Sequence, residues 1–191
     1  KYSFTESKKD GTTVKVEHTG LMPELEIEGG QSLNEIFDNL FGLLPKDQQV
    51  EIRKKYATKK KIASAPARIR TICKHIVKHY TSKILPNGYK AMIVAPTRAA
   101  AVTYKRELEK LTNLESRIIM NSKQDEVGPD GFSWSDYYLS PDDALIKADE
   151  FTTTANNEKF LIVVDMLLVG YDAPIIQVMY LDKPLKEHSL L

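Results

Sequence analysis

The sequence is poor in the residues that build covalent cross-links and metal sites. It has one cysteine, Cys73, which cannot form an internal disulfide, and no Cys and His cluster has metal-ligand spacing. His75 and His79 stand four residues apart, as metal ligands on a helix can, but no third ligand is near them, and we interpret them as surface histidines. No apolar run approaches the roughly 20 residues that cross a membrane, and no signal peptide is recognisable. We therefore expect a cytoplasmic protein without a disulfide framework, a metal cluster or a membrane contact.

The sequence also lacks the motifs of a self-sufficient nucleotide hydrolase. The phosphate-binding pattern G-x-x-x-x-G-K-[ST] does not occur. The letters D-E-x-x do occur, at Asp149–Thr152, but they follow a predicted helix rather than the buried strand that carries an acidic Mg²⁺ box. We expect no catalytic residue within the chain.

The size and the charge distribution are informative. A chain of 191 residues can hold one domain with a sizeable core. The formal net charge is +1, but residues 1–110 hold 21 Lys and Arg against 12 Asp and Glu, and residues 111–191 hold 6 against 14. Such asymmetry is typical of a nucleic-acid surface on one half, although solvated basic helices would produce it as well.

Short apolar segments alternate with amphipathic ones from residue 63 onward. Ser64 and Pro66 can begin a helix that reaches Tyr80, with Ser64 as the N-cap. Thr97 can cap a second helix, and Pro141 opens a third. Strands are expected at 91–95, 117–120, 160–164 and 175–181. This order predicts an α/β fold with a mostly parallel sheet flanked by helices.

Two regions lack such periodicity. Residues 1–62 favour a small N-terminal segment of short strands and helices. Residues 123–142 combine Gly, Pro and acidic residues and favour a long mobile loop, whose aromatic side chains, Trp134 among them, are expected to tuck against the domain.

The most informative stretch runs from Phe160 to Pro174. A buried strand ends at Asp165, and Gly170 permits a tight turn or a positive φ. Asp172 follows that turn. Because ligands of open α/β sheets collect at the carboxyl ends of strands, a carboxylate there can accept hydrogen bonds from a ribose. A turn-capping role for Asp172 is the alternative.

This stretch resembles motif V of superfamily 2 helicases and translocases. Its sequence is most similar to that of the motor (R) subunit of type I restriction enzymes. The motif of that family is roughly V-D-M-L-L-T-G-F-D-A-P, followed by Y-L-D-K-P-L-K-x-H. Val169 stands where that family often has Thr, so a hydrogen bond from this position is in doubt, and Tyr171 replaces Phe. Residues 91–111 resemble the motif IV strand and helix of the same family.

The resemblance implies roles for particular residues. Gly170 and Asp172 would bind the nucleotide. Thr97, Arg98, Asn121, Ser122 and Asp165 would contact the DNA backbone, with Asn121 and Ser122 matching a further motif weakly.

The resemblance also implies a place in a larger protein. Residues 63–191 would be the second RecA-like lobe, ending just before motif VI, and residues 1–62 would lead into it. The parent would be an ATP-dependent type I site-specific deoxyribonuclease, which binds ATP and Mg²⁺ together with a first lobe. Its partners would be double-stranded DNA and the modification and specificity subunits, and this chain alone would be inactive. A lobe of a repair helicase and a non-enzymatic α/β interaction module are the alternatives.

Overall fold

The described part of the chain forms an α/β domain around one parallel sheet. The computed structural model describes residues 17, 19–20, 45–48, 64–121, 135–137, 139–153, 157–168 and 171–183. Four strands, β1 (Lys90–Val94), β2 (Glu115–Met120), β3 (Glu158–Val164) and β4 (Ile176–Leu181), stand in the order β2-β3-β1-β4. All of their pairings are parallel, which confirms the predicted fold class.

The central strand β1 pairs on both sides. Met92 stands beside Leu161 of β3 and beside Met179 of β4. Every residue of β1 is buried. A strand buried on both faces needs apolar residues at successive positions rather than alternating ones. The segment Ala91–Val94 meets this requirement and for that reason was recognisable as a strand in the sequence.

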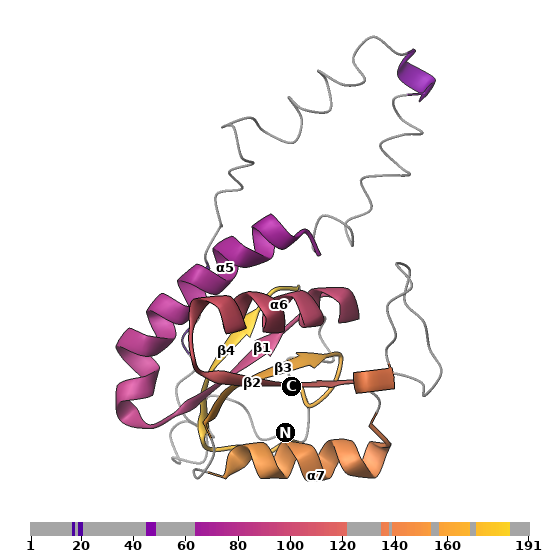
Figure 1. Cartoon of the computed structure of the whole chain (residues 1–191). Coiled ribbons are helices and arrows are strands. Elements are labelled where there is room, and N and C mark those ends of the chain that lie inside the picture. The colour runs from indigo at the N-terminus through magenta and orange to yellow at the C-terminus, as the bar shows by residue number, and fades with distance from the viewer. Residues whose placement is uncertain are drawn as a thin grey trace, which may run out of the picture.

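Helices cover both faces of the sheet (Figure 1). α5 (Pro66–His79) and α6 (Arg98–Leu111) lie together on one face, where Ile69, Tyr80 and Tyr104 are fully buried against Ile93 and Phe160. α7 (Pro141–Thr152) lies on the other face, where Ala148 and Phe151 pack against Met92, Leu161 and Val163. Alternate residues of each inner strand therefore enter two separate apolar clusters.

The connections that follow β1 and β3 cross opposite faces of the sheet and lead to opposite edges. From β1 it enters α6 on one face and returns as the edge strand β2. From β3 it crosses the other face, where Met166, Leu167 and Tyr171 pack with the α7 cluster, and reaches the opposite edge strand β4. Because β1 and β3 are neighbours, their carboxyl ends form the switch point at which open α/β sheets bind ligands.

Most predicted elements are confirmed, with bounds shifted by one or two residues. Thr97 caps α6, since its hydroxyl oxygen accepts a hydrogen bond from the Ala100 N–H at 3.0 Å. Ser64 does not cap α5. The N-cap of α5 is Ala65, without a side-chain bond, because the Ser64 hydroxyl is bonded instead to that of Thr97 at 2.7 Å. Cys73 is fully buried, as expected, and burial raises the pKa of its thiol to about 12.

Several expectations fall largely outside the described residues. Nearly all of the leading segment 1–62 lies there, as do Ser122, Trp134 and most of the predicted loop 123–142. Within the described part of that loop, Ser135–Tyr137 forms a short 3-10 turn, and Tyr137 packs against the core.

A buried lysine joins the sheet to α7. Lys90 is 1% exposed, and its ammonium donates to the carbonyl oxygens of Phe151 and Thr153, the latter at 2.6 Å. It also lies 4.6 Å from the centre of the Phe151 ring. Burial lowers the pKa of Lys90. The two carbonyls belong to the end of α7, where helix carbonyls lack intrahelical partners, so the ammonium both satisfies them and complements the helix dipole.

Replacing Lys90 by Met should therefore destabilise the fold. Lys90→Met keeps the apolar stem but leaves the buried Phe151 carbonyl and the partly buried Thr153 carbonyl without their donor, which should lower the free energy of unfolding by about 1–3 kcal/mol in urea titration. Lys147→Met is the matched control, because Lys147 forms a half-exposed pair with Glu150, whose loss should change the free energy of unfolding little. Equal stability of the Lys90→Met protein and the unaltered protein would contradict this role.

Candidate functional site at the carboxyl edge of the sheet

The carboxyl ends of the four parallel strands meet at one edge of the domain. The ladder continues past the strand ends there, since Ala95 N donates to Val163 O at 2.9 Å and Asp182 N donates to Val94 O at 3.0 Å. The segments that follow the strands carry the polar side chains of this edge: Thr97, Arg98, Asn121, Asp165, Asp182 and Lys183. Residues from four distant parts of the sequence are thus brought to one place.

The segment that follows β1 is linked to α5 and to the end of β2. The hydroxyls of Thr97 and Ser64 are hydrogen-bonded, which joins the start of α6 to the chain that leads into α5. Arg98, the first residue of α6, donates to the carbonyl oxygen of Asn121 at 3.3 Å. A cation at a helix N-terminus is opposed by the helix dipole, so this position is favourable when an anion lies near.

The segment that follows β3 has an unusual backbone. Asp165 has φ 54° and Leu167 has φ 59°, in the left-handed region that side chains other than Gly rarely enter. For a bulky residue such as Leu this conformation costs on the order of 1–3 kcal/mol, and such strain concentrates at functional sites. Lys183, beyond β4, forms an ion pair with the largely exposed Asp165 carboxylate. The crossing that resembles motif V is therefore held in a strained conformation.

Asp182, next to Lys183, makes the most buried ion pair of this edge. Its carboxylate accepts hydrogen bonds from both terminal nitrogens of Arg68, one at 2.8 Å, and from the Tyr104 hydroxyl at 2.8 Å. The side chain of Asp182 is 9% exposed and that of Arg68 is 18% exposed. Burial and the Asp182 charge raise the pKa of Tyr104 well above its usual range, so this hydroxyl stays a donor. No sequence pattern indicated that Arg68 and Tyr104 bind Asp182, although Asp182 itself lies in the Leu181–Pro184 motif.

Asp172 lies at the far end of the crossing from β3 to β4. It is exposed and directly precedes a turn in which Ile176 N donates to Ala173 O at 2.9 Å, just before β4 begins. Tyr171 is held by a hydrogen bond from its hydroxyl to Ala148 O of α7 at 2.7 Å. The structure thus brings Thr97, Arg98, Asn121 and Asp165 to the carboxyl edge. Asp172 instead lies near the beginning of β4, at the amino ends of the strands rather than at the carboxyl ends where the sequence led us to expect it. Gly170 and Ser122 lie outside the described residues.

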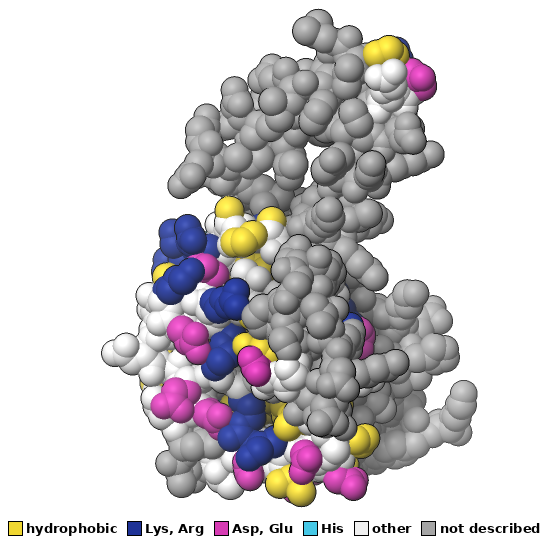
Figure 2. All heavy atoms as spheres, turned by 45° about the vertical axis from the view of Figure 1, so that its right-hand side comes forward, with side chains coloured by type: hydrophobic (Ala, Val, Ile, Leu, Met, Phe, Trp, Pro, Cys, Tyr) yellow, Lys and Arg dark blue, Asp and Glu magenta, His cyan; other side chains and the backbone are white. Residues whose placement is uncertain are grey.

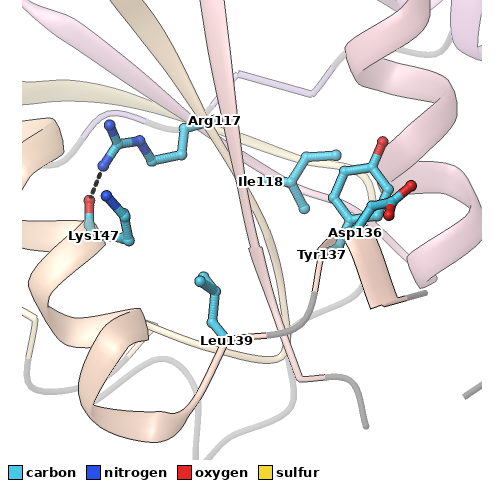
Figure 3. A pocket seen from close by; sticks show the side chains of 6 residues that line it. All are labelled: Arg117, Ile118, Asp136, Tyr137, Leu139 and Lys147. Carbon is cyan, nitrogen blue, oxygen red and sulfur yellow. Dashed lines mark hydrogen bonds between the residues drawn. The ribbon is translucent and has the colours of Figure 1, made fainter. Parts of the chain in front are cut away.

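A hollow of about 270 Å³ opens on the α7 side of the edge strand β2 (Figure 3). Arg117 and Lys147 line one side of it, and Asp136 and Tyr137 line the other. The Arg117 guanidinium donates to Lys147 O at 2.7 Å and pairs with Glu150 at 3.0 Å and Glu158 at 2.7 Å. Because the charge of Arg117 is compensated by these glutamates, the hollow does not concentrate positive charge.

The described residues supply neither a metal site nor a membrane segment. In this part of the chain, no three His, Cys, Asp or Glu side chains gather in a way that could hold a metal ion. Its helices are also too short or too polar to cross a membrane.

Comparison with known proteins points to one group. A model of the family described as type I restriction enzyme subunit R domain 3 matches residues 132–191. The type I restriction enzyme MjaIXP endonuclease subunit of Methanocaldococcus jannaschii is 26% identical over 99% of the chain, and the MjaVIIP subunit of the same organism is 33% identical over 72%. The HindI endonuclease subunit of Haemophilus influenzae is 22% identical over the full chain. The chain spans 18%, 14% and 18% of these relatives.

The two neighbouring ion pairs at the end of β4 should differ sharply in their contribution to stability. Asp182→Ala leaves the Arg68 charge without its buried partner, so the free energy of unfolding should fall by about 3–5 kcal/mol. Tyr104→Phe removes one hydrogen bond to a charged group and should cost about 1.5–3 kcal/mol. Asp165→Asn is the control, since its pair is largely exposed and should contribute about 1 kcal/mol or less. Urea unfolding that gives similar losses for Asp182→Ala and Asp165→Asn would contradict this assignment.

Proposed function

Because the chain is related along nearly its whole length to the R (endonuclease) subunits of type I restriction enzymes, we propose that it is the second RecA-like lobe of an ATP-driven DNA translocase in such an enzyme. The lobe contacts the backbone of double-stranded DNA through the carboxyl edge of its sheet. It contributes to ATP binding through the segment that crosses from β3 to β4. The parent protein belongs to a complex with modification and specificity subunits.

One observation carries the proposal. Thr97, Arg98, Asn121 and Asp165 lie together at the carboxyl edge of the sheet, which includes the switch point, and Asp165 at the exit of β3 has a left-handed conformation. Open α/β sheets bind ligands at this point. The fold alone does not require this strain, because a glycine in place of Leu167 would relieve it.

Arg98 is the best-placed residue for a phosphate of DNA. Its position at the N-terminus of α6 adds the positive end of the helix dipole to its own charge, and the bond to Asn121 O orients the guanidinium. Thr97 has its hydroxyl bonded within the domain, so its part is to fix the start of α6 and hence the place of Arg98.

Asp172 and Gly170 are proposed for the nucleotide side. Asp172 is exposed, and the turn after it and the Tyr171 bond to α7 limit the movement of its backbone. A carboxylate so placed can accept a hydrogen bond from a ribose hydroxyl. Because this sequence has no phosphate loop, the ATP phosphates and Mg²⁺ would be held chiefly by a first lobe, and bound ATP supplies the free energy that opens and closes the cleft between lobes.

The chain by itself should not hydrolyse ATP. It has no phosphate loop, and its described residues form no metal site. Phosphate release in the presence of ATP, Mg²⁺ and duplex DNA should therefore equal that of a buffer blank. Release clearly above the blank, and stimulated by DNA, would disprove the assignment of the catalytic groups to another lobe.

In the complete R subunit, Asp172→Ala should lower the rate of DNA-dependent ATP hydrolysis without unfolding the protein. The loss of one charge-assisted hydrogen bond corresponds to about 1.5–3 kcal/mol, so DNA-dependent ATP hydrolysis should fall more than about tenfold. Asp172→Asn, which keeps the shape, should have a smaller effect. Asp149→Ala, at another exposed position, should leave the rate unchanged. If Asp172→Ala hydrolysed ATP and translocated DNA at the wild-type rate, Asp172 would not be part of the nucleotide site.

A further inference from the structure

Acidic residues are absent from a long part of the sequence. No Asp or Glu occurs between Glu51 and Glu107, although Asp and Glu make up 26 of the 191 residues. The same stretch holds 15 Lys and Arg. Clustered cations without interspersed acids are the electrostatic signature of a polyanion-binding surface. The stretch includes all of α5 and most of α6.

Besides Arg98 and Arg106, the cations of this stretch that the structure describes fall into two groups. One group is used within the domain: Arg68 pairs with Asp182, Arg70 with Glu107, and Lys105 with Glu109, while Lys90 binds the end of α7. The second group is Lys74, Lys78 and Lys83. All three are exposed, and no ion pair engages them within the described residues.

Lys74 and Lys78 follow one another along the outer side of α5, and Lys83 lies in the helical turn that continues it. Lys74 and Lys78 lie opposite the buried stripe that contains Ile69, Cys73 and Ile76, and they are about 6 Å apart along the helix axis. Lys83 follows in the turn after α5. The exposed side chains between them are polar: His75, His79, Thr81 and Ser82.

In other parts of the domain, ion pairs bring charges of both signs together. Figure 2 shows Lys and Arg side chains with Asp and Glu beside them on the face that it presents. The pairs of Lys110 with Glu107 and of Lys147 with Glu150 are of this kind. Such neighbours compensate one another, whereas the outer side of α5 keeps its positive charge.

We propose that Lys74, Lys78 and Lys83 form a second contact for the phosphate backbone of duplex DNA, outside the carboxyl edge of the sheet. This inference rests on the proposed DNA-translocating function. α5 begins beside Thr97 at that edge, through the Ser64 bond, and Lys74 lies about 15 Å further along the chain's helical path. DNA that contacts Arg98 could therefore continue along α5.

The polar character of this surface favours DNA over an acidic protein partner. Protein interfaces have an apolar, aromatic-rich centre. The large apolar side chains that are exposed in the described residues are Tyr89, Leu145, Ile146, Met179 and Leu181, and none of them belongs to α5. Contacts made by cations and hydroxyl groups without an apolar centre are typical of binding to phosphates.

The test compares two triple variants of the full chain. Lys74→Gln/Lys78→Gln/Lys83→Gln removes the proposed contact, and Lys46→Gln/Lys110→Gln/Lys147→Gln removes the same charge elsewhere. Fluorescence anisotropy with a labelled 20-base-pair duplex (roughly two turns) would give Kd between about 50 and 200 mM salt. Each lost phosphate contact reduces the slope of log K against log salt by about 0.9, so the α5 variant should lose about 2–3 units of slope and bind at least about tenfold more weakly. Circular dichroism verifies that both variants are folded.

Three results would overturn the inference. Equal slopes for the α5 variant and the control variant would remove α5 from the DNA path while leaving the motor assignment intact. Displacement of DNA by poly-glutamate of equal charge at equal concentration would assign the surface to acidic polypeptides. Absence of duplex binding by the unaltered chain would reject the α5 contact. The ATPase response to Asp172→Ala in the complete subunit tests the motor assignment separately.

Discussion

The parallel pairing of β1 with strands on both sides is the constraint on which the rest of this domain depends. A strand that is paired on both edges and covered on both faces must be apolar at successive positions, and Ala91–Val94 are so. Parallel neighbours cannot be joined by tight turns, so each connection must cross a face of the sheet. The two apolar clusters and the common direction of the strand ends follow from this single arrangement.

The charged groups of the domain serve this arrangement. Lys90 enters the α7 face at the start of β1 and satisfies the carbonyls at the end of that helix. Asp182, at the end of β4, holds Arg68 of α5 and Tyr104 of α6 on the other face. Polar contacts thus join α7 to the sheet at the start of β1, and join α5 and α6 to the sheet at the end of β4. Buried charges of this kind are costly unless fully paired, so they fix the positions of the elements that they join.

The division of the surface is consistent with a motor lobe. The carboxyl edge carries Arg98 at a helix start and the strained strand exit at Asp165. The crossing segment leads from that edge to Asp172, near the start of β4. A segment that joins the proposed DNA side to the proposed nucleotide side could transmit a change at one to the other, because it packs against α7 and cannot shift freely. The basic side of α5 extends the positive surface away from the edge.

The sequence by itself determined the elements, because burial on one or both sides of a helix or strand imposes a local pattern. Such patterns predicted the buried stripe of α5 at Ile69, Cys73 and Ile76, the N-cap at Thr97 and the apolar strand β3. The residues of the Phe160–Pro174 stretch also indicated the family. The family model that matches residues 132–191 agrees with this indication.

The tertiary structure decided the strand order, and with it which side chains meet. No local pattern could show that Ser64 bonds to Thr97 instead of capping α5, or that Asp182 is shared by Arg68 and Tyr104. Nor could it show that Leu167 has a positive φ, since a leucine rarely adopts that conformation. These contacts join residues that are distant in sequence, and their geometry is set by the packing of the whole sheet rather than by the preferences of neighbouring residues.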